Sequence, residues 1–140
     1  MPTARRDAAP PTQAIVGLDV GTTGVKAVAF GLCARWERTA IREYPLLQPA
    51  PDQQVQDPAT IVTAAGDALA ECVAAVGPAE VLAVSLSVGM HGLMALDAEL
   101  RPLTPLVTWA DARARDEARS LRRSGQAGSC RRTPACPSIR

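Results

Sequence analysis

Two short apolar runs joined by a glycine-rich turn constrain the fold of this chain more than any other feature. The first run covers residues 14–20 and the second covers residues 25–33, with the sequence Gly-Thr-Thr-Gly at 21–24 between them. Because glycine allows a tight reversal of the backbone, the pattern predicts a β-hairpin. The more polar segment 37–44 would add a third strand and extend the hairpin into a meander.

A helix and a buried strand are expected after the meander. Asp57 is a suitable N-cap, and the proline that follows it is favoured at the first helical position. Apolar residues then recur at helical spacing over 61–76, and a Gly-Pro pair ends the pattern. The continuous apolar run at 81–87 is typical of a buried strand.

The pattern of apolar and polar residues after residue 87 gives a weaker indication of secondary structure. It predicts strands over 93–96 and 106–109, a turn over 97–101 between them, and a helix over 110–124. The resulting order, β-β-β-α-β-β-β-α, indicates an α/β protein with a mixed sheet. It does not show the regular alternation of a dinucleotide-binding fold.

The composition excludes several classes of protein. The chain has 140 residues, of which 47% are hydrophobic and 21% are charged, as in a soluble globular domain. A net charge of +1 argues against nucleic-acid binding. No apolar stretch is expected to span a membrane, and the first residues lack the apolar segment of a signal peptide, so a cytoplasmic protein is expected.

The two ends of the chain differ from its middle. Residues 1–13 are rich in Pro, Ala and Arg and are expected to form a mobile leader, whereas residues 14–120 form the domain. Residues 121–140 contain five arginines and no acidic residue, so they are interpreted as a basic tail. The four cysteines show no C-x-x-C spacing and are expected to be reduced thiols; they are Cys33, Cys72, Cys130 and Cys136.

The glycine turn carries the clearest chemical signal. Its backbone N–H groups and threonine hydroxyls could donate to an anion, and a carboxylate at the end of the first strand could hold a hydrated Mg²⁺ ion. A lysine shortly after the turn could neutralise further charge. The phosphate- and magnesium-binding candidates are Asp19, Gly21, Thr22, Thr23 and Lys26. The alternative is an ordinary glycine hairpin with a capping aspartate.

Three segments resemble the FGGY family of carbohydrate kinases. IVGLDVGTTGVKAVAF at 15–30 is similar to the first phosphate-binding hairpin of these actin-like sugar kinases. Residues 44–58 resemble the stretch that enters their first helix, and residues 81–114 give the longest match. The resemblance implies the first half of an actin-like, ribonuclease H-like domain, with ATP and Mg²⁺ as cofactors.

The same resemblance implies a sugar pocket. Its candidate residues are Met90, His91, Gly92, Trp109 and Asp111. Hydroxyl groups of a sugar suit the polar members, and the indole offers a flat apolar wall. From its chemistry alone, Arg113 could also pair with a sugar carboxylate. Without the resemblance, a lone histidine, a core tryptophan and a solvated helical arginine would be the ordinary interpretations.

The implied activity is transfer of the ATP γ-phosphoryl group to a hydroxyl of a small sugar or sugar acid. Trp-Ala-Asp at 109–111 resembles gluconate kinases most, with xylulose kinases next. The general base, second phosphate loop and adenosine pocket of the family fall outside the matched segments. The chain is therefore expected to be inactive alone, as an N-terminal fragment, with residues 121–140 interpreted as the product of a frameshift.

Other functions stay open. The chain could be a non-catalytic sugar-binding or partner-binding module, or belong to another class of actin-like ATPase. Half a domain would also leave apolar surface uncovered, which favours association with a second copy or with a complementing C-terminal fragment.

Overall fold

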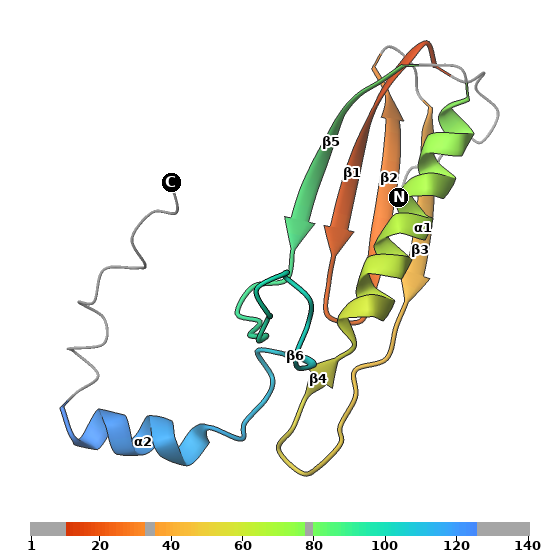
Figure 1. Ribbon diagram of the computed structural model, residues 1–140. Coiled ribbons are helices and arrows are strands. Elements are labelled where there is room, and N and C mark those ends of the chain that lie inside the picture. The colour runs from red at the N-terminus through yellow and green to blue at the C-terminus, as the bar shows by residue number, and fades with distance from the viewer. Residues whose placement is uncertain (1–10, 33–35, 78–79, 126–140) are drawn as a thin grey trace.

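A four-stranded mixed sheet with one helix across it forms the body of the molecule. The computed structural model describes residues 11–32, 36–77 and 80–125. The elements are β1 (Gln13–Val20), β2 (Gly24–Gly31), β3 (Glu37–Glu43), β4 (Val55–Gln56), α1 (Pro58–Val76), β5 (Glu80–Val88), β6 (Leu106–Val107) and α2 (Arg115–Arg123). The sheet has the order β3-β2-β1-β5, as Figure 1 shows. Most of the expected leader, residues 126–140 of the expected tail, and Cys33, Cys130 and Cys136 lie outside the described residues.

The predicted meander is confirmed, and β5 joins it in parallel. β1 and β2 pair antiparallel across the glycine turn, with Val20 opposite Val25, and β2 pairs antiparallel with β3. β1 pairs parallel with β5, so that Leu18 lies beside Leu86. The carboxyl ends of β1 and β5 therefore meet at one edge of the sheet, where Gly89 N donates to Val20 O at 2.8 Å.

Small side chains bring α1 close to the sheet. The Asp57 carboxylate caps the helix by accepting from the N–H groups of Ala59 and Thr60, as its N-cap position predicts. Alanines are frequent on both sides of the helix–sheet contact, which lets the two backbones approach each other. The buried residues of this core are Ala64, Ala68, Cys72 and Val76 from α1 and Ala14, Val16, Leu18, Val25, Ala27, Ala29 and Ala40 from the sheet.

The length and hydropathy of α1 correct one expectation. The helix has 19 residues and a mean hydropathy of 1.5, so among the described residues one helix is long and apolar enough to cross a membrane. The expectation of no such stretch is wrong on these measures. The helix packs an alanine-rich stripe on β1, β2 and β3, and 22% of its apolar window is buried.

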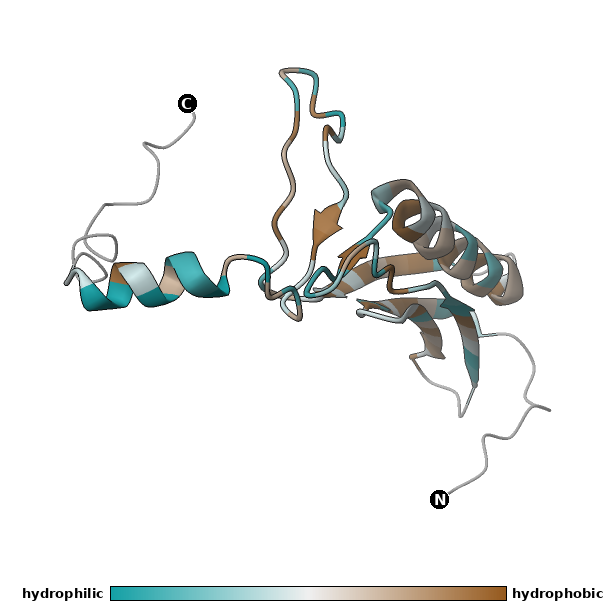
Figure 2. Ribbon diagram, turned by 90° about the horizontal axis from the view of Figure 1, so that it is seen from below, coloured by the Kyte–Doolittle hydropathy of each residue, from teal (hydrophilic) through white to brown (hydrophobic). Residues whose placement is uncertain are grey.

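The second half of the chain differs from its predicted secondary structure. Residues 93–96 form only isolated bridges, Leu93 to Val107 and Leu96 to Pro102, and the strand predicted over 106–109 shortens to β6. β6 pairs instead with β4, which local sequence does not predict. Residues 93–107 thus form a narrow projecting arm, seen in Figure 2. The predicted turn over 97–101 lies at its tip, where Asp97 N donates to Arg101 O at 3.0 Å.

The final helix starts later than predicted. α2 begins at Arg115 rather than at residue 110. The preceding backbone is held elsewhere, because Ala112 N donates to Asp52 O at 2.8 Å and the Asp111 side chain accepts from Gln54 N at 2.7 Å. These contacts with the loop before β4 prevent residues 110–114 from entering the helix.

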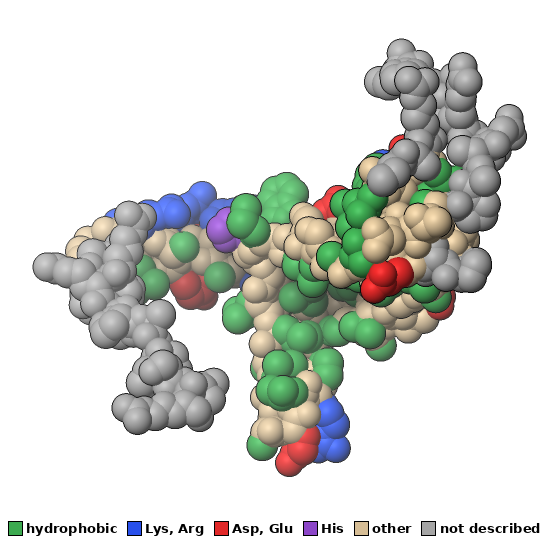
Figure 3. All heavy atoms as spheres, turned by 90° about the horizontal axis from the view of Figure 1, so that it is seen from above, with side chains coloured by type: hydrophobic (Ala, Val, Ile, Leu, Met, Phe, Trp, Pro, Cys, Tyr) green, Lys and Arg blue, Asp and Glu red, His purple; other side chains and the backbone are tan. Residues whose placement is uncertain are grey.

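Much apolar surface stays uncovered. α1 covers β1, β2 and β3 but barely reaches β5, so Val84, Leu86 and Val88 are each at least half exposed. Leucines are exposed along the arm as well, including Leu93 and Leu103. Figure 3 shows hydrophobic side chains running along the arm toward a charged tip. Such surfaces are typical of an interface that another segment covers.

The close helix–sheet contact makes Ala68 intolerant of a larger side chain. We expect Ala68→Leu to lower the free energy of unfolding by about 1–3 kcal/mol, because the helix would have to move off the sheet. Ala70→Leu makes the same change at an exposed position of α1 and should cost far less. Urea unfolding followed by circular dichroism measures both. Equal losses in the two variants would contradict this account of the contact.

Candidate active site

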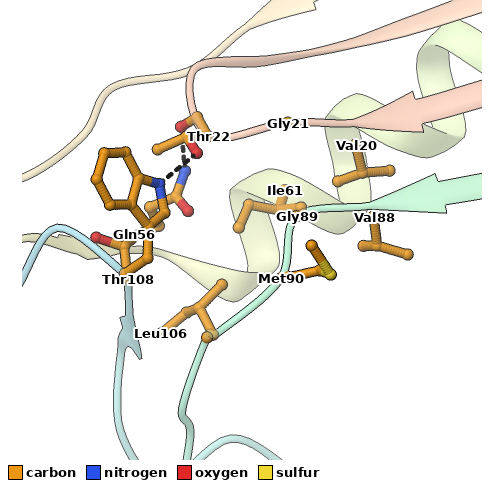
Figure 4. Close-up of a pocket in the computed structure, with 12 residues that line it drawn as sticks. Val20, Gly21, Thr22, Gln56, Ile61, Val88, Gly89, Met90, Leu106 and Thr108 are labelled. Carbon is orange, nitrogen blue, oxygen red and sulfur yellow. Dashed lines mark hydrogen bonds between the residues drawn. The ribbon is translucent and has the colours of Figure 1, made fainter.

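A pocket of about 90 Å³ opens where the carboxyl ends of β1 and β5 meet. This edge is where ligands bind in open α/β sheets. The start of α1 and the segment after β6 complete the walls, as Figure 4 shows. The lining residues are Val20, Gly21, Thr22, Gln56, Ile61, Val88, Gly89, Met90, Gly92, Leu106, Thr108 and Trp109.

The glycine turn is tightly closed beside this pocket. Gly21 N donates to Gly24 O at 2.9 Å and completes the reversal between β1 and β2. A Cβ atom at Gly24 would lie 2.8 Å from Arg42 O, a backbone atom of the neighbouring strand. Only glycine fits there without moving β3, so the second glycine of the turn is required by packing.

Donors from elsewhere in the fold occupy the carbonyl groups of the turn. Tyr44 Oη donates to Gly21 O at 2.7 Å, and Gln56 Nε2 donates to Thr22 O at 2.6 Å. The backbone N–H of Tyr44 donates to Thr23 O at 3.2 Å. Within the described residues, no protein group accepts a hydrogen bond from the backbone N–H of Thr22 or Thr23. The turn therefore presents free donors, as an anion site requires.

The sugar-pocket candidates meet the phosphate candidates at this turn. Trp109 Nε1 donates to Thr22 Oγ1 at 3.3 Å, although 87 residues separate the two. Met90 and Gly92 line the same pocket. His91 lies between them, exposed and outside the pocket lining, with a φ of 63° that is uncommon for a residue with a side chain.

Asp19 and Lys26 lie outside the pocket lining. They are directly opposite each other in the β1–β2 ladder, on the sheet face that α1 does not cover, and both are exposed. Burial and the charge of Asp19 raise the pKa of the Tyr44 hydroxyl, so that carboxylate is near the turn. In the described ranges, no three His, Cys, Asp or Glu side chains form a cluster that could hold a metal. The role of Asp19 in holding a hydrated Mg²⁺ ion stays a prediction.

Asp111 and Arg113 are bound to each other. Arg113 Nε and one Nη donate to the two carboxylate oxygens of Asp111, both at 2.8 Å. The Asp111 side chain is only 3% exposed, and that of Arg113 is 42% exposed. The Arg113 guanidinium and the Gln54 N–H hold the pKa of the Asp111 carboxyl well below its usual range. Arg113 also borders a separate, more open pocket of about 600 Å³ between the arm and the loop before β4.

Two residues of the site were not among the sequence candidates. Tyr44 and Gln56 are both buried, and their side chains reach the turn from 23 and 34 residues away. Both stand within the segment that resembles the entry to the first helix, but nothing in their local spacing indicates a contact with the turn.

The family of the chain follows from comparison with known proteins. Residues 14–136 match the N-terminal domain of the FGGY family of carbohydrate kinases. The chain therefore belongs to this family, and its sheet and helix are those of the actin-like ATPase fold.

Known relatives have several different substrates in their names. Gluconokinase of Bacillus subtilis is 32% identical over 111 residues, which cover 79% of this chain and 22% of that protein. The crystal structures of gluconate kinase and of ligand-bound xylulose kinase from Lactobacillus acidophilus superpose with TM-scores of 0.77 and 0.78. Both are 29% identical and cover 84% of this chain and 24% of theirs. The chain thus spans about a quarter of the length of these relatives.

The pair formed by Asp111 and Arg113 predicts a change in acid stability. Because folding lowers the pKa of Asp111, its contribution is present above the unfolded-state pKa and is lost as the pH falls toward the folded-state value. Arg113→Gln should raise the folded-state pKa and flatten the loss of stability between about pH 4 and pH 2.5. Urea unfolding across this range measures the slope.

Arg115→Gln provides the matched control for this experiment. It removes the same charge from an arginine whose partner, Asp52, is exposed and 3.6 Å away. Its acid slope should match that of the wild type. If the stability of Arg113→Gln falls with pH as steeply as that of the wild type and of Arg115→Gln, the ion pair does not set the pKa of Asp111.

Proposed function

We propose that this chain is the N-terminal part of an ATP-dependent kinase for a small sugar or sugar acid, with gluconate as the preferred substrate. The observation that carries the proposal is the glycine turn. Its carbonyls are occupied, and the N–H groups of Thr22 and Thr23 are free beside a pocket lined by sugar-site candidates. Membership of the FGGY family supports the same activity.

The turn would receive the phosphate groups of ATP. The N–H groups of Thr22 and Thr23 and their hydroxyls would donate to phosphate oxygens, while Gly21 keeps the approach open. Asp19 would hold Mg²⁺ through water, and Lys26 would offset part of the negative charge. Bound MgATP supplies the γ-phosphoryl group, and the residues of this chain bind and orient it.

The pocket would receive the acceptor. Met90 and Trp109 form its apolar walls, and the backbone at Gly92 lies close enough to Leu106 that a Cβ would meet that side chain at 2.9 Å. We place His91 at the sugar hydroxyls, where an imidazole forms hydrogen bonds. The Asp111 carboxylate is buried and bound by Arg113 and Gln54 N, so its role would be to hold Arg113 in place. His91 is exposed and would turn toward the pocket from the adjacent backbone.

Arg113 favours a sugar acid over a neutral sugar. Its Nε and one Nη are used by Asp111, which leaves the N–H groups of the other Nη for a substrate carboxylate. Because Arg113 borders the separate pocket of about 600 Å³, a sugar acid would have to extend from the pocket of Met90 and Trp109 to reach it. Because Asp111 fixes the guanidinium plane, little side-chain entropy would be lost on binding. A xylulose kinase is the alternative. It would not use the free Nη of Arg113, because xylulose has no carboxylate.

Phosphoryl transfer requires parts that we assign to the remainder of a longer enzyme. In this proposal a general base and a second phosphate loop come from outside residues 14–120, and the match to about a quarter of the relatives' length supports it. Alone, the chain would bind ligands without transferring phosphate. A sugar-binding module is the second candidate function, and the pocket itself supports it.

Ligand titration tests the two halves of the site separately. In ¹⁵N spectra of the full chain, triphosphate with Mg²⁺ should shift the amides of Thr22 and Thr23, because these donors are free. Gluconate should shift the indole N–H of Trp109. Arg113→Gln should weaken gluconate about tenfold while leaving xylulose unchanged, since one charge-assisted pair is lost.

Each result decides one part of the proposal. Triphosphate shifts that miss the turn would remove the phosphate site. Equal effects of Arg113→Gln on both sugars would remove the carboxylate role of Arg113 and favour the xylulose alternative. Transfer of phosphate by this chain alone would contradict the assignment of the general base to another segment.

The uncovered face of β5 predicts self-association of the isolated chain. β5 carries no charged side chain after Glu80, and Leu86 is 61% exposed, so pairing between copies is favoured. Leu86→Lys should reduce the associated fraction in sedimentation velocity, because a charge opposes strand pairing. Thr39→Lys on the charged edge strand β3 is the control and should have little effect. A monomeric wild-type chain would contradict the prediction.

A further inference from the structure

The contacts of the glycine turn assign roles to residues beyond the candidate set. We propose that Gln56 is a positioning residue for the phosphate-binding turn, acting together with Tyr44. This inference rests on the proposed phosphate function of the turn. The structural basis is that each side chain occupies one carbonyl of the turn through a short hydrogen bond.

The planarity of the peptide unit links each carbonyl to one free donor. In a trans peptide, the C=O of one residue and the N–H of the next point in opposite directions. Thr22 O and Thr23 N belong to the same unit, so the bond from Gln56 Nε2 directs the Thr23 N–H. By the same geometry, the bond from Tyr44 Oη to Gly21 O directs the Thr22 N–H.

The hydrogen bonds from Gln56 and Tyr44 are needed to fix the turn, because an unrestrained peptide unit can rotate and exchange the positions of its C=O and N–H. If the unit between Thr22 and Thr23 rotated, its carbonyl oxygen would face the phosphate and repel it. The held orientation needs no reorganisation when an anion arrives, which is how preorganised donors gain affinity. Gln56 thus favours one of two orientations of this unit.

Gln56 is itself held firmly. Its side chain belongs to a residue that is 4% exposed, and its backbone pairs with Leu106 across β4 and β6. Asp57, the N-cap of α1, follows directly. Figure 4 shows the Gln56 amide directed at Thr22, between the turn and the start of α1. The helix that packs on the sheet therefore also fixes the amide.

Trp109 orients the remaining donor of the turn. Its indole N–H donates to Thr22 Oγ1, so the hydroxyl proton of Thr22 is left to donate elsewhere. This bond links the acceptor side of the pocket to the phosphate side.

The substitution Gln56→Glu in the full chain tests the role of Gln56 through pH. Ionised glutamate has the same shape but no proton to donate, and it would repel Thr22 O. Below its pKa, which burial raises, the carboxyl regains a donor. We therefore expect the affinity for magnesium triphosphate, relative to wild type at the same pH, to fall about tenfold at pH 8. The ratio should return toward one at pH 5.

Two further variants complete the design. Gln48→Glu makes the same change on an exposed loop residue and should give a ratio near one at both pH values. Gln56→Met removes the donor without adding charge, so it serves if the glutamate variant does not fold. It should weaken triphosphate binding about tenfold at both pH values.

The Thr23 amide resonance separates this inference from the proposed function. Without ligand, it should shift with pH in Gln56→Glu, and that pH-dependent shift should be absent in the wild type and in Gln48→Glu. An unchanged Thr23 amide in the Gln56 variants overturns the positioning role, whether or not triphosphate binds. A shifted amide in a wild-type chain that does not bind triphosphate keeps the positioning role and overturns the phosphate function.

Discussion

The double pairing of β1 is the constraint on which the rest of the structure depends. β1 is antiparallel to β2 and parallel to β5, so one of its ends carries both the glycine turn and the junction with the segment after β5. The bond from Gly89 N to Val20 O closes this junction. Met90 and Gly92 consequently lie beside a turn that is about 70 residues earlier in the chain. The site follows from the order of the strands.

The parts of the fold that were predictable have strong local patterns. β1, β2, β3, α1 and β5 follow from alternation, helical spacing, an aspartate cap and glycine punctuation. β4 and β6 have two residues each and exist only because they pair with each other over about 50 residues. A strand was predicted over 93–96 in the arm, yet these residues make only isolated bridges. The local pattern of apolar residues cannot predict elements such as β4 and β6, whose structure depends on pairing with a distant segment.

The same distinction separates the parts of the site. Thr22 was a candidate from the glycine turn, whereas Met90, Gly92 and Trp109 were candidates from the family resemblance, and all four line one pocket. Tyr44 and Gln56 were not candidates. Each contributes a hydrogen bond to a carbonyl that is distant in the sequence, and such a contact cannot be predicted from local pattern. Strand alternation, in contrast, is enough to place Asp19 on the sheet face opposite α1.

The two halves of the proposed reaction depend on this chain to different degrees. The hydrogen bonds to the turn carbonyls come from Tyr44, a core residue that follows β3, and from Gln56 of β4, which precedes the N-cap of α1. The acceptor pocket is shallow, and Trp109 forms one wall with an indole that is two thirds exposed. A wall of this kind excludes water only when a second surface closes over it, and the uncovered faces of β5 and the arm lie next to the same opening. In the proposed function, the turn offers the phosphate donors of this chain, and the shielding that phosphoryl transfer needs would come from a surface that closes over the pocket.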